Sequence, residues 1–238
     1  MINKKVSEIR DFCTRNSNQA NIEKYSRYFK DGFNGYGIDQ KVFEQQRDAW
    51  INLWKNEMNL DKYLELGDTL VRIGKYEEIS FAISFVASER KNYSEKTFDR
   101  IGTWFDYGIT NWANTDVLCM LVLSNFLIDK VVPYTKLLEW TDSHSEWKRR
   151  AVPVTLVELV RKGLTPDEAI PLIEPLMYDK SENVQKGIGT LLRGLWKSHP
   201  ERIEAFLLKW KNSCGRLIIQ YSTEKMDKEY RKKFRREK

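Results

Sequence analysis

Apolar residues recur along most of the chain at spacings of three and four, and segments that alternate apolar with polar residues are scarce. This pattern predicts helices near residues 4–14, 18–30, 39–57, 60–73, 76–90, 94–106, 111–128, 134–141, 145–162, 165–178, 181–198, 200–212 and 215–235. The capping residues agree, because Ser94 precedes "EKTF" and Thr165-Pro166 opens "DEAIPLI". The sequence therefore predicts an all-α protein.

Two local features qualify this pattern. The stretch "DGFNGYGID" (residues 31–39) is rich in glycine, but it has neither the glycine spacing nor the preceding strand of a phosphate-binding loop. We interpret it as a connection between helices. Pro153 falls within the helix expected at 145–162, where its ring removes a backbone hydrogen bond and should kink the helix.

Four long helices begin at nearly constant intervals. "SEWKRRAVPVTLVEL" begins at Ser145 and "SENVQKGIGTLLRGL" begins at Ser181, 36 residues later. "NWANTDVLCMLVL" begins at Asn111, 34 residues before Ser145, and "YEEISFAISFV" begins at Tyr76, a further 35 residues back. Other helices alternate with these four. This interval predicts a HEAT-like repeat α-solenoid of antiparallel helix pairs, and the lack of a Pro-, Gly- or Ser-rich linker indicates one domain, 1–238.

The net charge of +6 is concentrated at the C-terminus. From Lys225 to Lys238 there are eight basic and three acidic residues, a net +5, so residues 1–224 carry only +1. The segment 224–238 is therefore a basic helix or tail. It is either a solvated helix end or a contact for phosphates, and the sequence alone leaves both open.

Composition excludes several classes of protein. A hydrophobic fraction of 41% with eight tryptophans predicts a packed core, and the chain has no apolar run of about 18 residues that could span a membrane. "MINKKVSEIR" lacks the apolar stretch of a signal peptide. Cys13, Cys119 and Cys214 lie far apart and form no CxxC pattern, which favours a reduced, cytoplasmic protein without disulfides or zinc. With only His144 and His199, histidine-based metal or triad chemistry has little support.

The repeat register brings together three charged residues. In the three long helices that begin at Asn111, Ser145 and Ser181, the sixth residue is Asp116, Arg150 and Lys186, respectively. Equivalent positions of a solenoid lie side by side, so we expect these groups in a row across three adjacent helices. Trp112 lies one turn before Asp116 on the same face. As an alternative, Asp116 and Arg150 form an inter-repeat salt bridge and nothing more.

A polar stripe follows the last of these helices. Lys186, Thr190, Arg193 and Lys197 fall at i, i+4, i+7 and i+11, and apolar residues fill the opposite side. Three positive groups on one stripe could follow a phosphate backbone. An ordinary solvated helix face has the same pattern.

Four segments in order resemble the AlkD-type DNA alkylation-repair proteins, which are HEAT-like repeat DNA glycosylases. "YSRYFKDGFNGYGI" resembles the family's N-terminal helix and loop, "NWANTD" its Trp-x-x-x-Asp segment, "EWKRRA" its Trp-x-x-Arg-Ala segment, and "QKGIGTLLRGLWKSHP" its late helix. The resemblance extends from about Asn21 to about Tyr221. It implies a concave, basic groove that holds duplex DNA, and excision of cationic N3- or N7-alkylated purines without extruding the base from the stack.

The resemblance also assigns roles to residues. Asp116 is the implied catalytic carboxylate, Trp112 faces the deoxyribose, and Arg150 holds DNA beside them. A cationic base leaves without a general acid, so a carboxylate that stabilises the oxocarbenium-like sugar suffices, and an indole face adds roughly 0.5–2 kcal/mol. We expect no metal, no cofactor and a monomer. The remaining expected DNA contacts are Arg149, Lys186, Thr190 and Arg193.

The chain departs from the family's pattern at three positions. Asn111 and Ala113 replace the residues that flank the tryptophan, and Thr190 stands where active members carry a second sugar-facing tryptophan. Trp196 lies six residues further on, and therefore on another side of the helix. Two alternatives thus accompany the glycosylase hypothesis. One is a non-catalytic relative that binds damaged or branched DNA, and the other is a protein-binding scaffold built from HEAT-like repeats.

Overall fold

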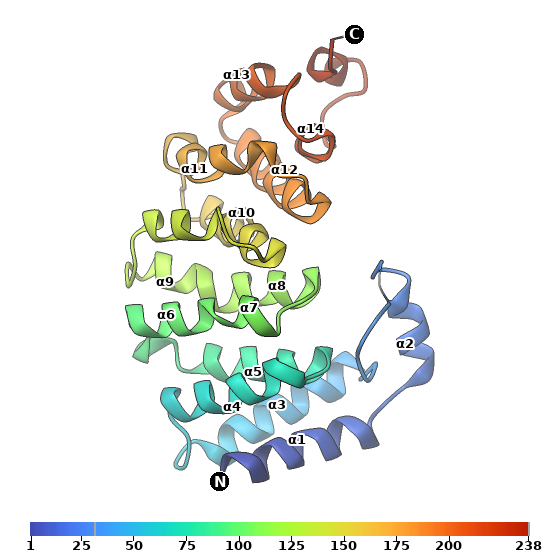
Figure 1. Ribbon diagram of the computed structural model, residues 1–238, viewed down its shortest axis with the longest axis vertical. Helices are drawn as coiled ribbons and strands as arrows, with labels where there is room; N and C mark the ends of the chain where they lie inside the picture. The colour runs from blue at the N-terminus through green and yellow to red at the C-terminus, as the bar shows by residue number, and fades with distance from the viewer. Residues whose placement is uncertain (31, 238) are drawn as a thin grey trace. The chain divides into compact units, whose positions relative to one another are not determined.

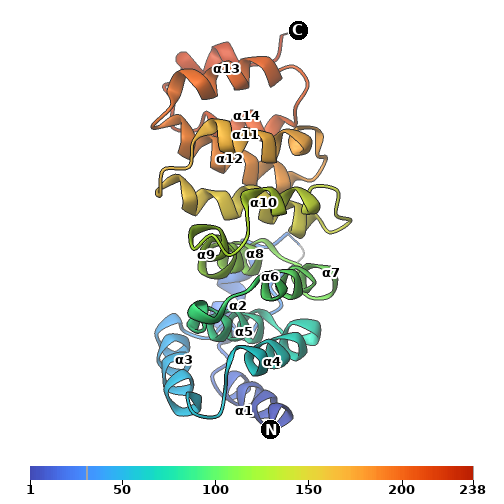
Figure 2. The same ribbon diagram turned by 90° about the vertical axis from the view of Figure 1, so that its left-hand side faces the viewer.

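The computed structural model describes residues 1–30 and 32–237, and every regular element within them is helical (Figures 1 and 2). The all-α prediction is therefore confirmed. The α-helices are α1 (Ile2–Arg15), α2 (Gln19–Ser26), α3 (Gln40–Trp54), α4 (Leu60–Ile73), α5 (Tyr76–Ser88), α6 (Glu95–Gly102), α7 (Trp104–Tyr107), α8 (Trp112–Leu118), α9 (Ser124–Ile128), α10 (Glu146–Val160), α11 (Pro166–Ile173), α12 (Glu182–Trp196), α13 (Pro200–Trp210) and α14 (Arg216–Ser222). Shorter 3-10 segments are Arg90–Asn92, Tyr134–Trp140, Glu174–Tyr178 and Tyr230–Phe234.

The helices form two compact units, Met1–Val122 and Leu123–Lys238. The boundary falls inside a π-helical turn, Cys119–Leu123, that joins α8 to α9, and not in a polar linker. Each unit has a core of its own, described in turn below. Within the part of the chain that the structure describes, no helix is both long enough and apolar enough to cross a bilayer.

Aromatic rings fill the core of the first unit. Trp50 stacks on Trp54 with ring centroids 5.3 Å apart, and Trp50 meets the edge of Phe81 at 5.1 Å. Phe85 continues this cluster from the next turn of α5. All four rings are buried, so Trp50 and Trp54 serve packing in this core.

In the second unit, α12 packs between α10 and α14 (Figures 1 and 2). Two glycines of α12 permit this close packing. A Cβ at Gly189 would lie 2.5 Å from Tyr221 Cβ of α14, and one at Gly187 would lie 3.2 Å from Pro153 of α10. Fully buried aliphatic side chains complete the interface, among them Leu156, Ile188, Leu191 and Ile218.

The starts of α10 and α12 confirm the repeat spacing in this unit. Ser145 and Ser181 are the N-cap residues, and each hydroxyl accepts a hydrogen bond from a backbone N–H of the first turn. Both helices have 15 residues, and α10 runs through Pro153 to Val160. The two segments that the sequence aligned at an interval of 36 residues therefore form equivalent helices.

Several predicted helices end earlier or change type. The helix expected at 94–106 divides at Thr103, and 134–141 is a 3-10 segment. The helix at 165–178 becomes 3-10 from Glu174, where Pro175 has no N–H to donate. The prediction for 18–30 is too long, because α2 ends at Ser26.

The predicted helix at 215–235 is wrong in its second half. The α14 helix ends at Ser222, and the Asp227 carboxylate then accepts the backbone N–H groups of Glu229 and Tyr230 at 2.8 and 3.3 Å. This cap starts a separate turn. The chain folds back so that Phe234 becomes fully buried. The tail is therefore a packed segment and not a solvated helix end.

Glu204 of α13 holds this tail in place. Its carboxylate accepts hydrogen bonds from Tyr230 Oη and Lys233 Nζ of the tail, both at 2.7 Å, and from Trp196 Nε1 at 3.0 Å. Burial raises the pKa of Glu204, but the hydrogen bonds from Lys233, Trp196 and Tyr230 outweigh it, so the pKa lies below the usual value of 4.5.

Candidate nucleic-acid interface

The first turn of α8 contains the segment "NWANTD", and its amides form a cap. Asn111 is the N-cap, and its Oδ1 accepts the backbone N–H of Asn114 at 2.8 Å. The Asn114 amide is fully buried and donates to Tyr76 O and Ser80 Oγ of α5, each at 3.2 Å. Asn111 and Asn114 therefore fix the start of α8 to its neighbour.

Trp112 and Asp116 lie on another face of α8, one helical turn apart. The indole N–H of Trp112 donates to Tyr28 O at 3.1 Å, and its ring stacks on Phe29 with centroids 5.5 Å apart. The ring nevertheless remains 37% exposed. Asp116, one helical turn later, is half-buried. The first unit thus presents a fixed, partly exposed indole and a half-buried carboxylate on one face of α8.

A cavity of about 660 Å³ in the first unit adjoins Trp112. Seven of its seventeen lining residues are aromatic, and Ser80 and Ser84 of α5 also line it. The aromatic lining consists of Tyr25, Tyr28, Phe29, Phe33, Phe43, Tyr76 and Trp112. The sequence analysis assigned a function to Trp112 alone among these rings. The only signal was the aromatic density of "YSRYFKDGF", which we used as a family signature alone.

The glycine-rich connection forms part of this surface, and a carboxylate of the chain itself binds its backbone. Glu77 is only 4% exposed. Its Oε2 accepts the N–H of Tyr36 at 2.7 Å, and its Oε1 accepts those of Gly37 and Ile38 at 2.7 and 3.2 Å. Gly37 has a φ of +69°, which only glycine adopts without strain. Residues 32–39 lie between α2 and α3 and form no helix, which confirms the interpretation as a helix connection. The backbone N–H groups of Tyr36, Gly37 and Ile38 are bound by Glu77 and are not open to a phosphate.

The second unit contains the predicted cations. Arg150 is 8% exposed, and its Nη1 donates to Asn183 O at 2.6 Å. Its aliphatic stem lies beside Gly187, where an added Cβ would be 3.6 Å from Arg150 Cγ. Asn183 and Gly187 flank Lys186 on the first turns of α12. The structure therefore brings Arg150 and the Lys186 turn together.

The polar stripe of α12 makes mostly internal contacts. Lys186 Nζ lies 3.6 Å from Glu182 Oε2, a weak surface pair. The Thr190 hydroxyl donates to Lys186 O at 2.8 Å, one turn earlier. Arg193 forms an ion pair with Glu224, just after α14. Lys186 and Arg193 thus stay within reach of solvent, whereas the Thr190 hydroxyl is occupied by the helix backbone.

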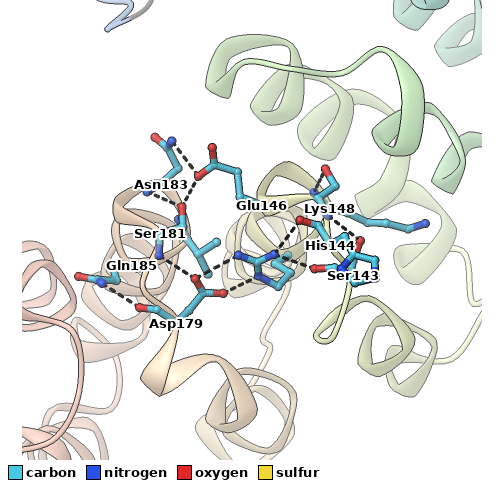
Figure 3. Close-up of polar contacts among 11 residues, drawn as sticks. Ser143, His144, Glu146, Lys148, Asp179, Ser181, Asn183 and Gln185 are labelled. Carbon is cyan, nitrogen blue, oxygen red and sulfur yellow. Dashed lines mark hydrogen bonds and ion pairs between the residues drawn. The ribbon is translucent and has the colours of Figure 1, made fainter.

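A polar network lies between the starts of α10 and α12 (Figure 3). Arg149 of α10 takes part in it. Its Nε donates to Asp179 Oδ2 at 2.6 Å, its Nη2 donates to Asp179 Oδ1 at 3.3 Å, and its Nη1 donates to Ser143 O at 2.7 Å. Nearby, the Glu146 carboxylate accepts hydrogen bonds from the N-cap hydroxyl Ser181 and, at 3.2 Å, from the Asn183 amide (Figure 3). The guanidinium of Arg149 thus joins α10 to Asp179, in the segment just before α12.

The other candidates have structural partners. Trp196 donates its indole N–H to Glu204, in keeping with the expectation that it does not replace a tryptophan at position 190. The three cysteines are buried, and none of them forms a disulfide within residues 1–30 and 32–237. Across residues 1–30 and 32–237, no three His, Cys, Asp or Glu side chains are grouped so that they could hold a metal ion.

Comparison with known proteins places these features in context. The family model described as DNA alkylation repair enzyme matches residues 10–226. The fold is similar to a predicted DNA alkylation repair enzyme from Enterococcus faecalis, with 16% identity over 89% of this chain and 97% of that chain and a TM-score of 0.73. It is also similar to AlkD2 from Streptococcus mutans, with 19% identity over 87% of this chain and 99% of that chain and a TM-score of 0.60. No curated protein sequence matches the chain.

Proposed function

Because the chain belongs to the DNA alkylation repair enzyme family, we propose that it hydrolyses the N-glycosidic bond of cationic N3- or N7-alkylated purines in duplex DNA. In this proposal Asp116 is the catalytic carboxylate and Trp112 faces the deoxyribose. The alkylated base carries a positive charge and departs as a neutral molecule, so no group has to protonate it. The demanding species is the oxocarbenium-like sugar.

The observation that carries the proposal is the anchored indole of Trp112, with the Asp116 carboxylate one helical turn later on the same face of α8. A carboxylate that is held in place stabilises a developing cation without reorganising during the reaction, and it can orient the attacking water. Trp112 is anchored at its edge by Tyr28 O and on its ring by Phe29, so it offers a rigid surface to the sugar. The Asn111 cap sets where both side chains project.

DNA binding in this proposal uses the cations of the second unit. Arg150 is a rigid charge because Asn183 O and the surface of α12 fix it. Lys186 and Arg193 are more exposed and bind phosphates by exchanging their surface carboxylate partners for the DNA backbone. Thr190 contributes only its methyl group to such a surface, because its hydroxyl binds Lys186 O.

A non-catalytic DNA-binding protein is the second candidate, and one observation favours it. At position 190 the side chain is a threonine whose hydroxyl is engaged within the helix, so the late helix offers no aromatic wall there. Such a protein would recognise damaged or branched DNA through backbone contacts alone. It would bind with a steep salt dependence but release no base.

The deciding experiment measures free 7-methylguanine and 3-methyladenine released from methylated duplex DNA. We expect release by the wild-type protein and a loss of at least about 100-fold in Asp116→Asn, which keeps the shape but removes the charge. Asp142→Asn is the control, because Asp142 is an exposed carboxylate in the turn before α10. If the wild type releases no base, the glycosylase proposal is wrong. If Asp116→Asn retains full activity, the assignment of the carboxylate is wrong.

Gel shifts on duplex and branched DNA over a range of salt separate both DNA-based candidates from a protein-binding scaffold. Neutralised phosphates give a linear fall of log K with log salt, by roughly 0.9 for each contact. A scaffold gives weak binding without that slope.

A further inference from the structure

The packed tail encloses a second hollow, of about 790 Å³, within the second unit. One wall comes from α14 and the other from residues 228–236, and the floor includes Ile219, Thr223 and the fully buried Phe234. Seven cationic side chains line the hollow, whereas Glu229 is its only carboxylate among the lining residues. Five of the eight basic residues of the tail therefore line one concave surface.

Internal contacts satisfy only some of these cations. Lys211 pairs with Glu237 at 2.7 Å, Lys232 pairs with Glu229, and Arg236 donates to Cys214 O at 2.7 Å. The other four form no salt bridge within residues 1–30 and 32–237. They are Arg216, Lys228, Arg231 and Arg235. Arg231 is half-buried in the wall, so its charge is partly removed from water even though it has no carboxylate beside it.

The tail packs against the rest of the second unit and is not a loose terminus. The tail docks through the buried ring of Phe234 and through the hydrogen bonds from Tyr230 and Lys233 to Glu204. Docking brings like charges together, and their mutual repulsion opposes it. A bound polyanion would relieve that repulsion, because a cleft lined by one sign of charge concentrates ions of the opposite sign.

We propose that this hollow binds backbone phosphates of DNA, as an anchoring site separate from the residues proposed for catalysis. The inference rests on the proposed function for its ligand. The tail segment that forms the second wall, residues 228–236, lies beyond the end of the family match at residue 226. Guanidinium groups suit phosphates because they offer two parallel donors.

The test compares two double variants that remove the same charge. Arg231→Gln/Arg235→Gln empties the hollow of two unpaired cations whose side chains make no internal hydrogen bond in the described residues. Arg161→Gln/Lys162→Gln removes two exposed cations at the end of α10 and serves as the control. Binding to an unmodified duplex is measured at several salt concentrations, and thermal melting confirms that both variants fold.

We expect the slope of log K against log salt to fall by about 1.8 in the hollow variant, because each lost phosphate contact removes roughly 0.9, and to stay unchanged in the control. Calorimetric titration with inorganic pyrophosphate distinguishes the source of the phosphate. If only pyrophosphate binding is lost and the DNA slope is unchanged, the hollow holds small phosphorylated ligands and the proposal is overturned.

An unchanged slope with unchanged pyrophosphate binding overturns it as well. The proposed function is tested separately by the wild type. A wild-type protein that fails to bind DNA refutes that function, whereas one that binds DNA with the same slope as the hollow variant refutes the anchoring site alone.

Discussion

Replacing Glu77 by glutamine tests how the glycine-rich connection is held beside the candidate site. Glu77 is buried, and its two oxygens accept three backbone N–H groups, those of Tyr36, Gly37 and Ile38, at 2.7, 2.7 and 3.2 Å. Glutamine has nearly the same shape, but it offers one oxygen in place of two. Its NH₂ group must then face at least one of these backbone donors.

The magnitude follows from the hydrogen bonds. A bond to a charged group contributes roughly 1.5–3 kcal/mol, and a buried donor left without an acceptor costs about 1–3 kcal/mol. Glutamine keeps some of the hydrogen bonds, but its NH₂ group leaves at least one buried backbone N–H without an acceptor. We therefore expect Glu77→Gln to lower the free energy of unfolding of the first unit by about 2–4 kcal/mol.

Urea unfolding measures this free energy, and hydrogen exchange locates it. The amides of Tyr36, Gly37 and Ile38 should exchange faster in the variant, before the amides of α4 and α5 do. Glu23→Gln, an exposed change on α2, is the control and should stay within about 0.5 kcal/mol of the wild type. A loss below about 0.5 kcal/mol in Glu77→Gln would refute the reasoning that this carboxylate holds the connection.

Two further predictions concern the second unit. The pKa of Glu204 is lowered in the folded protein, so the carboxylate stabilises the fold above its unfolded pKa near 4.5, and this stabilisation is lost as the pH falls below that value. In urea unfolding between about pH 6 and pH 3, the difference in free energy of unfolding between wild type and Glu204→Gln should therefore shrink as the pH falls. A difference that stays constant with pH would contradict this. Arg149→Met should lower the free energy of unfolding by about 3 kcal/mol, because the buried carboxylate of Asp179 loses its ion-pair partner. The slope of log K for DNA binding against log salt should stay unchanged. A slope reduced by roughly 0.9 would instead identify Arg149 as a phosphate contact.

The periodic part of the fold was predictable because it depends on local chemistry. The N-cap residues Ser145 and Ser181 mark equivalent helix starts, and each is followed by apolar residues at helical spacing through a helix of 15 residues. The same local signals failed where tertiary contacts decide. The tail carries good helix formers, yet the burial of Phe234 and the cap at Asp227 end the helix at Ser222.

Contacts between residues far apart in the chain explain most of what the sequence did not reveal. Glu77 reaches the connection at residues 36–38, and its carboxylate looked like an ordinary helix-start acid in the sequence. Arg149 gave the same signal as Arg150, its neighbour on α10. Only the structure distinguishes the guanidinium that binds Asp179 from the one that reaches the first turn of α12.

Four of the six residues of "NWANTD" divide two tasks among them, and this division makes the tasks separable. Asn111 and Asn114 bind backbone and α5 through their amides, so their roles are structural. Trp112 and Asp116 project from the turn that those amides fix. Changes at the amides should therefore act first on the stability of the first unit, and changes at Trp112 and Asp116 should act first on DNA chemistry. A helix cap and a carboxylate with a chemical role are thus compatible, because they lie on different faces of α8.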